Sequence, residues 1–298
     1  MEKNNNLKKK IIGIAVFGYN RPKELETILL KIQDYKSKSS FNFEVKVFID
    51  GLKKKEDKKI LRKNLLIKKK FNNFKFIISD FNKGLSKSIL NGLDRMAKEY
   101  EYFLVFEDDI LIIKNLDILL IKVIKKKLMK KYSSLSFYCP FGINFRNFFK
   151  DLKLLETYRM QCWGWFTSSE NWKSFRKVSS DKFLKKINKK SYILNIGEDS
   201  YSRLLETIYN NRDIWACRWI AFNYKLKKPS LVPSTTFIKN IGTGNNGTNV
   251  TSSLSKIREL LNEYTTYIKL IFFKFTKIEI KKIKKQELEI ITNRNKII

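Results

Sequence analysis

Three adjacent carboxylates, Glu107, Asp108 and Asp109, follow an apolar run that ends at Phe106. Acidic side chains this close together repel one another, so the triplet needs a compensating cation. A Mg²⁺ or Mn²⁺ ion would supply it, because hard oxygen ligands suit these ions and substrate phosphates complete their coordination shell. The alternative is a solvated acidic turn, which the strand–helix context described below disfavours.

The 298-residue chain contains no histidine. This excludes Ser-His-Asp and Cys-His catalysis as well as histidine-based metal sites. Acid–base chemistry therefore falls to carboxylates. Glu198 and Asp199 precede a helical run and are candidates for a general base that activates a hydroxyl group. The alternative is an acidic helix start that complements the helix dipole.

Two further polar segments follow apolar runs. Asp50 and Gly51 come after the run 45–49, and this pair is also typical of an ordinary turn. Residues 82–86 open a helix whose amides, with Lys83 and Lys87, would face a phosphate. A plain N-cap at Ser86 explains the same residues, and both interpretations stay open.

Four β-rich runs alternate with helical patterns in the first 110 residues: 11–17, 45–49, 74–79 and 102–106. One helix is expected after Pro22 and another near Ser86. Such alternation predicts a mostly parallel sheet covered by helices, with ligands beyond the carboxyl ends of the strands. The fold would then bring together the polar residues at those ends, which are Asn20, Arg21, Asp50, Asn82 to Lys87, and Glu107 to Asp109.

The later part of the chain gives weaker signals. Gly242, Gly244 and Gly247 spell G-x-G-x-x-G, but the pattern lies late in the chain and opens no clear helix of a βαβ unit, so a flexible substrate loop is favoured. All five tryptophans lie within residues 132–250. Beyond residue 250, apolar residues recur at helical spacing among lysines, which predicts a basic helical tail.

Charge and cysteine content bear on partners and location. Lys and Arg number 62 against 29 Asp and Glu, a net charge of +33 that favours anionic partners, although a Lys-rich composition throughout accounts for part of it. The three cysteines are widely spaced and indicate a reducing cytoplasm. The run 11–17 imitates a signal peptide but lacks a cleavage site, and no apolar stretch approaches the 18 residues of a membrane span.

Taken together, the segments resemble the GT-A glycosyltransferases, the family-2-like nucleotide-sugar transferases, and more distantly animal N-acetylglucosaminyltransferase I. The resemblance covers about residues 11–250 and depends on the order and spacing of short motifs. These are Phe17 to Pro22, Ile49 to Gly51, Asn82 to Leu85, Phe106 to Asp109, Cys162 to Trp165, Gly197 to Asp199, Trp215 to Trp219 and Asn240 to Gly242.

The resemblance implies an α/β, Rossmann-like GT-A fold with a mostly parallel sheet flanked by helices. The domain would span 1–250, with a nucleotide-sugar-binding half at 11–131 and an acceptor or catalytic half at 132–250, followed by the basic helical tail at 251–298. The implied activity is inverting transfer of a hexosyl or N-acetylhexosaminyl group from a nucleoside diphosphate donor, for which the resemblance implies UDP. The acceptor would be a hydroxyl of a glycan or lipid-linked molecule in polysaccharide biosynthesis.

The same resemblance assigns roles to individual residues. Asp109 would bind Mn²⁺ or Mg²⁺, and Asp199, with Glu198 beside it, would be the base. Trp163 and Trp165 would wall a sugar, with core packing as the alternative. The remaining donor-binding residues are Asn20, Arg21, Asp50, Asn82, Lys87, Glu107 and Asp108. One departure is Asn249, which stands where family members often carry the histidine of a Gly-Thr-His loop.

Two other classes of function are kept as alternatives. A nucleotidyltransferase of similar fold should carry a Gly-rich, basic phosphate loop directly after the first strand, and residues 18–22 are not such a loop. A non-catalytic basic protein would bind nucleic acid or membrane; nucleic acid is disfavoured as a partner of this chain. The tail is expected to bind an anionic membrane, which would add peripheral attachment at the inner face of the cell membrane to a cytoplasmic location.

Overall fold

The structure is a computed structural model that describes residues 11–53, 58–139, 152, 154–209 and 214–242. Within these ranges the chain forms an eight-stranded sheet and a separate two-stranded sheet. The strand order of the large sheet is β3-β2-β1-β4-β8-β6-β9-β7, and the small sheet pairs β10 with β5. The strands are β1 (Ile11–Gly18), β2 (Asn42–Ile49), β3 (Lys75–Ile78), β4 (Tyr102–Glu107), β5 (Ile110–Ile112), β6 (Leu135–Ser136), β7 (Leu154–Thr157), β8 (Trp165–Ser168), β9 (Ser230–Pro233) and β10 (Ile238–Asn240).

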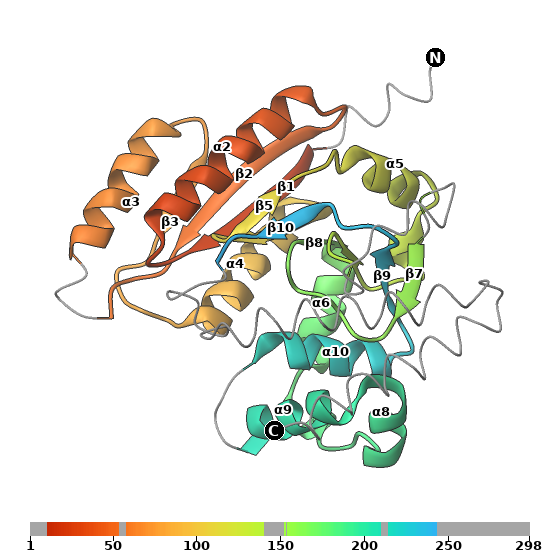
Figure 1. Cartoon of the computed structure of the whole chain (residues 1–298). Coiled ribbons are helices and arrows are strands. Elements are labelled where there is room, and N and C mark those ends of the chain that lie inside the picture. Colours follow the sequence, from red (N-terminus) through yellow and green to blue (C-terminus); the bar gives the residue numbers. More distant parts are fainter. Residues whose placement is uncertain (1–10, 54–57, 140–151, 153, 210–213, 243–298) are drawn as a thin grey trace.

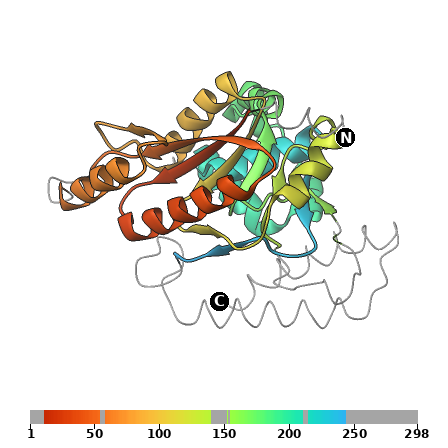
Figure 2. The same cartoon turned by 90° about the horizontal axis from the view of Figure 1, so that it is seen from above.

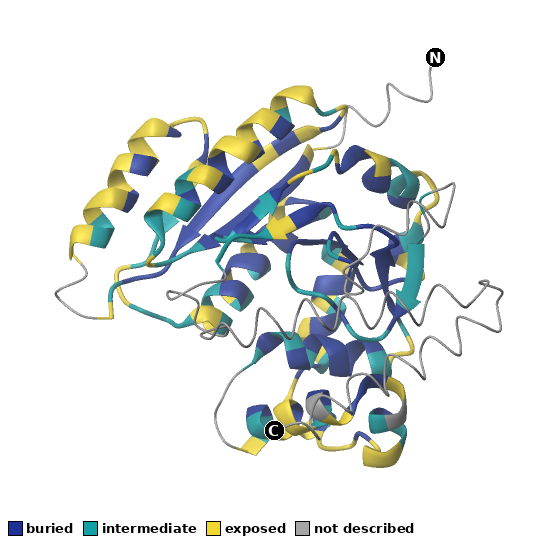
Figure 3. Ribbon diagram, viewed as in Figure 1, coloured by how far each residue is buried: buried dark blue, intermediate teal, exposed yellow. Residues whose placement is uncertain are grey.

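Helices cover both faces of the large sheet (Figures 1 and 2). Alternation along β1 explains this arrangement, because Ile14 and Val16 pack in the cluster that includes α2 and α5 while Ala15 and Phe17 pack against α4 and α10. Figure 3 shows the strands buried between helices whose outer faces are exposed. The helices are α2 (Pro22–Lys38), α3 (Lys58–Lys70), α4 (Leu85–Glu99), α5 (Asp117–Lys125), α6 (Ser169–Val178), α7 (Asp181–Leu184), α8 (Lys189–Ile196), α9 (Glu198–Tyr209) and α10 (Trp215–Lys225), with a short 3-10 turn at Leu128–Lys130.

The predicted alternation of strands and helices is confirmed. Strands β1 to β4 coincide with the four predicted β-rich runs, and helix α2 begins at Pro22, whose fixed φ suits the first turn of a helix. The buried residues of α2 include Leu25, Ile28, Leu29 and Ile32, which recur at the spacing of one helix face. Strands β1, β2, β3 and β4 pair in parallel. The chain therefore has the predicted Rossmann-like α/β fold.

The order β3-β2-β1-β4 creates a switch point between β1 and β4. After β1 the chain moves outward to β2 and β3, and then returns to place β4 on the other side of β1. Connections on the two sides of such a point leave in opposite directions, which opens a crevice beyond the carboxyl ends of the two strands. The residues that follow β1 and β4 are therefore the first place to look for a ligand site.

The second half of the chain extends the same sheet. Strand β8 pairs antiparallel with β4 along Tyr102–Val105, and β6, β9 and β7 continue outward from it. The described parts of the two predicted halves thus share one sheet.

The predicted tail, residues 251–298, lies outside the described residues. No described helix is long and apolar enough to cross a membrane.

A buried carboxylate, Asp117, ties α5 to the end of α2. Its oxygens accept hydrogen bonds from the Tyr35 hydroxyl (2.6 Å), the Ser39 hydroxyl (2.7 Å), and the amide (2.7 Å) and hydroxyl (2.8 Å) of Ser40. Burial alone would raise the pKa of Asp117, but the hydrogen bonds from Ser39, Tyr35 and Ser40 outweigh it and lower that pKa. The ionised carboxylate is therefore the stabilising form.

We expect Asp117→Ala to reduce the free energy of unfolding by about 2–4 kcal/mol, because it leaves several buried donors without an acceptor. A carboxylate whose pKa is lowered on folding stabilises the folded state at pH values above its unfolded pKa of about 4. This stabilisation is lost as the pH falls through the pKa of the folded state. The difference between parent and variant, measured by urea unfolding, should therefore shrink below about pH 4. Asp34→Asn, at an exposed carboxylate on α2, is the control. A difference that persists unchanged in acid would contradict the prediction.

Candidate functional site

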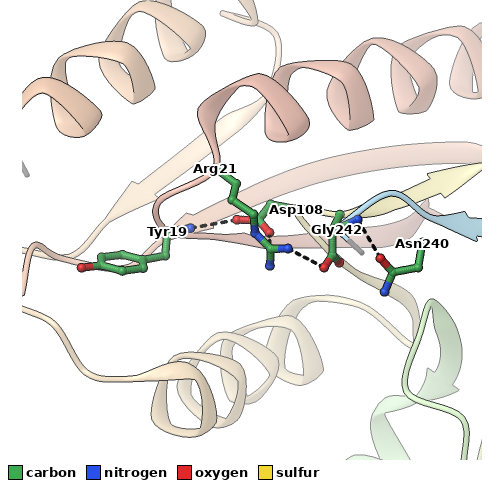
Figure 4. A network of polar contacts seen from close by, with 6 residues as sticks. Tyr19, Arg21, Asp108, Asn240 and Gly242 are labelled. Carbon is green, nitrogen blue, oxygen red and sulfur yellow. Dashed lines mark hydrogen bonds and ion pairs between the residues drawn. The ribbon is translucent and has the colours of Figure 1, made fainter. Parts of the chain in front are cut away.

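Arg21 connects the residues that follow β1 to the carboxylates that follow β4. Its Nη2 atom lies 2.9 Å from Asp108 Oδ1 and its Nη1 atom lies 2.6 Å from Asp109 Oδ2. The backbone amide of Tyr19 donates to the other oxygen of Asp108 at 3.1 Å. Figure 4 shows this network at the switch point. The sequence predicted that the carboxylates need a cation, and the structure shows Arg21, 88 positions away, beside them.

Strand β10 and the two residues that follow it lie beside the carboxylates. The amide of Ile241 donates to the carbonyl of Asp109 at 2.8 Å. The amide of Gly242 donates to the Asn240 side chain at 2.8 Å, as Figure 4 shows. A Cβ atom added to Gly242 would lie 2.3 Å from Asp109 Oδ2 and 2.4 Å from Arg21 Nη1. Only glycine allows the backbone to approach the salt bridge this closely. Position 242 is thus explained by this contact, which the sequence did not predict.

Burial raises the pKa values of Glu107 and Asp108. Burial is the largest cause for Glu107, followed by the charges of Asp109 and Asp108, and its pKa rises to about 8 against the opposing charge of Arg21. Burial also raises the pKa of Asp108 to about 7, although Arg21 and the Tyr19 amide favour the charged form. A neutral Glu107 is able to donate a hydrogen bond near pH 7.

The composition of this site fits a divalent cation. Arg21 supplies one positive charge beside Asp108 and Asp109, so the cluster keeps an excess of negative charge when both of these carboxylates are ionised, even with Glu107 neutral. The described residues contain no group of three or more His, Cys, Asp or Glu arranged to hold a metal by themselves. An ion here would need oxygens from a substrate, as Mg²⁺ bound by one or two carboxylates does. Asp109, partly exposed, is suited to be the protein ligand.

Asp50 forms a clamp between two loops at the same edge of the sheet. Its carboxylate accepts from the amides of Gly51, Lys83 and Gly84, each at 2.9 Å, and the Asn82 side chain donates to the Gly51 carbonyl at 2.9 Å. A Cβ atom at Gly51 would lie 2.2 Å from the carbonyl carbon of Phe81. The convergence of residues 50 and 82 that the sequence predicted is therefore confirmed as a contact, whereas their donor-binding role stays a prediction.

The clamp changes the interpretation of the start of α4. Two amides that were candidates for a phosphate, those of Lys83 and Gly84, already bind Asp50. The N-cap is Gly84 rather than Ser86, so the alternative of a Ser86 cap is wrong. The Ser86 hydroxyl instead accepts from the amide of Trp215 at 3.1 Å and links α4 to α10. Lys87 is exposed in the first turn of α4.

Tyr19 was not selected from the sequence, although it lies within a quoted motif. Its amide binds Asp108, its carbonyl accepts from the Asn64 side chain at 3.1 Å, and its hydroxyl accepts from the amide of Lys53 at 3.3 Å. Asn64 comes from α3, so this helix supports the loop that follows β1. Asn20, a predicted donor-binding residue, is exposed beside it.

Trp165 packs in the core, and its predicted contact with a sugar is wrong. Its side chain has no exposed surface, and its ring lies 5.5 Å from that of Trp215, 5.2 Å from that of Trp219 and 6.4 Å from that of Trp172. A ring without exposed surface cannot stack on a ligand. Trp163 is partly buried and meets the Tyr138 ring edge-on at 4.9 Å, so its predicted sugar contact stays a prediction.

The segment before Trp163 also lies beside the carboxylates. Burial raises the pKa of the Cys162 thiol to about 12, and the charges of Glu107, Cys217 and Asp109 contribute. Cys217 lies near the start of α10. The described site is therefore assembled from the residues after β1, those after β4, the end of β10, and the segment around Cys162.

The candidate base is carried by α9. Glu198 is exposed and begins the helix, and Asp199 follows it in the first turn. The next residue, Ser200, is hydrogen bonded to Tyr192 of α8, whose ring packs 5.2 Å from that of Tyr224 near the C-terminal end of α10. Because α10 starts at Trp215 beside α4, the start of α9 lies toward the other end of α10. The role of Asp199 stays a prediction.

Other predictions fall outside the described residues. Gly244, Gly247 and Asn249 belong to the predicted substrate loop, and the boundary between the predicted domain and its tail lies near them. Gly242, the first glycine of that pattern, is described and contacts the carboxylate cluster.

We expect Gly242→Ala to break the salt bridge between Arg21 and Asp109 and to cost about 1–3 kcal/mol of stability, the usual range for overpacking. The clash involves the Asp109 side chain, so much of this cost should disappear in an Asp109→Ala background. Urea unfolding of the parent, both single variants and the double variant measures the coupling between the two positions. Additive effects would show that Gly242 does not act through Asp109.

Comparisons with known proteins find remote structural similarity alone. No protein-family model matches the chain, and no curated protein matches it. TarS of S. aureus is similar over 91% of this chain and 68% of its own, with 15% identity and a TM-score of 0.43. A complex of TarS with UDP-GlcNAc matches over 43% of this chain and 33% of its own, with 21% identity and a TM-score of 0.30.

Two other solved structures are also similar. The galactosyltransferase LgtC, in complex with donor and acceptor sugar analogs, matches over 83% of both chains with 9% identity and a TM-score of 0.37. The 4-diphosphocytidyl-2C-methyl-D-erythritol synthase of Anaerococcus prevotii matches over 87% of this chain and 97% of its own, with 15% identity and a TM-score of 0.37. The function is therefore proposed from the site itself.

Proposed function

We propose that this protein is an enzyme that transfers a sugar from a nucleoside diphosphate donor to a hydroxyl of a glycan or lipid-linked acceptor. The donor is a UDP-sugar. The observation that carries the proposal is the position of the Arg21–Asp108–Asp109 cluster, which lies at the switch point between β1 and β4. Open α/β sheets bind nucleotides at such points. The order of the motifs along the chain, which resembles that of GT-A glycosyltransferases, supports a sugar nucleotide as the ligand.

A divalent Mn²⁺ or Mg²⁺ ion belongs to the proposed donor site. When bound, it would neutralise charge on the diphosphate leaving group. Asp109 would hold it, because this carboxylate is partly exposed while Asp108 is buried against Arg21 and the Tyr19 amide. Glu107, kept largely neutral by burial, would donate a hydrogen bond to a donor hydroxyl.

The chain's own residues would act in two places. Asp50 and Asn82 hold the loops that would frame the nucleoside, and Arg21 positions the carboxylates. Asp199, in the first turn of α9, would take the proton of the acceptor hydroxyl as this oxygen attacks the anomeric carbon. The bond from the anomeric carbon to the diphosphate oxygen breaks on the opposite face, so the configuration inverts.

Thermal unfolding in the presence of candidate donors tests the proposed function. We expect a UDP-sugar with Mn²⁺ to raise the unfolding temperature of the full chain, because a ligand that binds only the folded state stabilises it. GDP, dTDP and CMP sugars serve as matched ligands. A nucleotidyltransferase would instead consume a nucleoside triphosphate and a sugar phosphate, and product analysis distinguishes the two. Absence of stabilisation by every sugar nucleotide would overturn the proposal.

A further inference from the structure

Helix α3 has the most uneven charge of the described helices. It carries seven basic residues and no acidic one within thirteen positions, whereas none of the other described helices has a surplus of more than two basic residues. A general enrichment in lysine would affect all helices alike. The charge of α3 is therefore a local feature, although Glu56 and Asp57 precede the helix in the sequence. Its basic residues are Lys58, Lys59, Arg62, Lys63, Lys68, Lys69 and Lys70.

The outward face of α3 combines this charge with apolar surface. Asn64 and Ile67 are the buried residues of the helix, and on the other side Leu65 and Leu66 are 41% and 63% exposed. Arg62 and Lys69 lie one turn before and one turn after these leucines, so cations flank them along one face. Figure 3 shows that most of the helix surface is exposed, and Figure 1 places α3 at the flank of the fold.

Intramolecular partners account for little of this charge. Lys70 pairs with Glu26 of α2 at 2.6 Å, and this is the single ion pair that joins α3 to an acidic residue within the described part of the chain. The inner face is fixed to the fold, because the Asn64 side chain donates to the Tyr19 carbonyl. A rigidly held helix thus presents an outward surface of cations and leucines.

We propose that the outward face of α3, formed by Lys58, Lys59, Arg62, Leu65, Leu66 and Lys69, docks the protein on an anionic lipid bilayer. Charge complementarity selects an anionic partner, and the exposed leucines favour a bilayer over a nucleic acid, because leucines can enter the boundary between head groups and acyl chains. This surface is distinct from the predicted basic tail. The inference does not depend on the proposed function, since docking requires no nucleotide.

Docking through α3 would place the residues after β1 near the bilayer. The Tyr19 main chain and hydroxyl contact Asn64 of α3 and Lys53 of the preceding loop, and the Tyr19 amide binds Asp108. The carboxylate cluster is therefore linked to the docking helix through one residue. A lipid-linked acceptor would meet the enzyme at such a surface.

Co-sedimentation of the full chain with vesicles tests the proposal. We expect binding to vesicles of phosphatidylglycerol and phosphatidylcholine in equal amounts, and little binding to phosphatidylcholine alone. Replacing Lys58, Lys59, Arg62 and Lys69 by glutamine should weaken binding on the order of 10²- to 10³-fold, because each basic residue near an anionic surface contributes about 1 kcal/mol. The matched control replaces exposed lysines on α6, α7 and α8 by glutamine: Lys173, Lys177, Lys182 and Lys190. Equal losses in the two variants would overturn the proposal.

A second variant separates a bilayer from other polyanions. Leu65→Gln with Leu66→Gln keeps every charge but removes the apolar surface, and we expect vesicle binding to fall roughly 10-fold. Unchanged vesicle binding by this variant, with displacement of the parent by single-stranded polyuridylate, would identify a nucleic-acid surface and overturn the proposal. Thermal unfolding of each variant, monitored by circular dichroism, confirms that the substitutions leave the fold intact.

Discussion

Asp109→Asn is expected to remove metal-dependent donor turnover while the protein stays folded. The substitution keeps the side-chain volume and removes the negative charge of a carboxylate that pairs with Arg21. Loss of the proposed metal ligand should lower the transfer rate on the order of 10²- to 10³-fold, since charge neutralisation by a metal contributes several kcal/mol. Release of UDP from a UDP-sugar, with and without Mn²⁺, measures the effect.

Asp34→Asn is the matched control for this variant. It removes one carboxylate from the exposed face of α2, where Asp34 pairs with Lys38 at 2.6 Å, and it should leave turnover unchanged. The unfolding temperature of Asp109→Asn without ligand should stay close to that of the parent, because Arg21 keeps its contact with Asp108. Turnover by Asp109→Asn at the parental rate in the presence of a chelator would show that the metal assignment is wrong.

Asp199→Asn is expected to bind the donor normally and to transfer the sugar slowly. The amide cannot accept the acceptor proton, and a positioned general base usually contributes a factor on the order of 10² to 10⁴. The chain has no histidine that would replace it. Donor affinity by calorimetry and the transfer rate with saturating donor separate binding from catalysis.

Glu198→Gln is the control for Asp199, because Glu198 is the adjacent carboxylate and is exposed at the start of α9. It should retain transfer. The reverse pattern, with an inactive Glu198→Gln and an active Asp199→Asn, would move the role of the base by one residue. Equal activity of both variants and the parent would show that neither Glu198 nor Asp199 is the general base.

The elements of the first half were predictable because their signals are local. Each of β1 to β4 is a short apolar run, and α2 repeats apolar residues at helical spacing after Pro22. The rule that ligands bind at the carboxyl ends of parallel strands then brought Asp50 and Asn82 to one edge. The structure joins them through Gly51, Lys83 and Gly84.

The partners within the site were not predictable, because they depend on contacts between distant parts of the chain. Arg21 was expected to bind a donor, and in the structure its guanidinium pairs with Asp108 and Asp109. Trp165 lies near Trp163 in the sequence and was given the same role. It points into a cluster built from α6 and α10, whose packing on β8 no local pattern specifies.

The central claim is that the sugar-nucleotide donor lies at the switch point between β1 and β4. Anomalous scattering from crystals grown with UDP and Mn²⁺ tests it most directly, because it locates the ion without reference to activity. We predict a manganese peak about 2 Å from a carboxylate oxygen of Asp109, with the diphosphate of UDP completing its coordination. UDP bound elsewhere on the protein, with no manganese beside Asp109, would contradict the account.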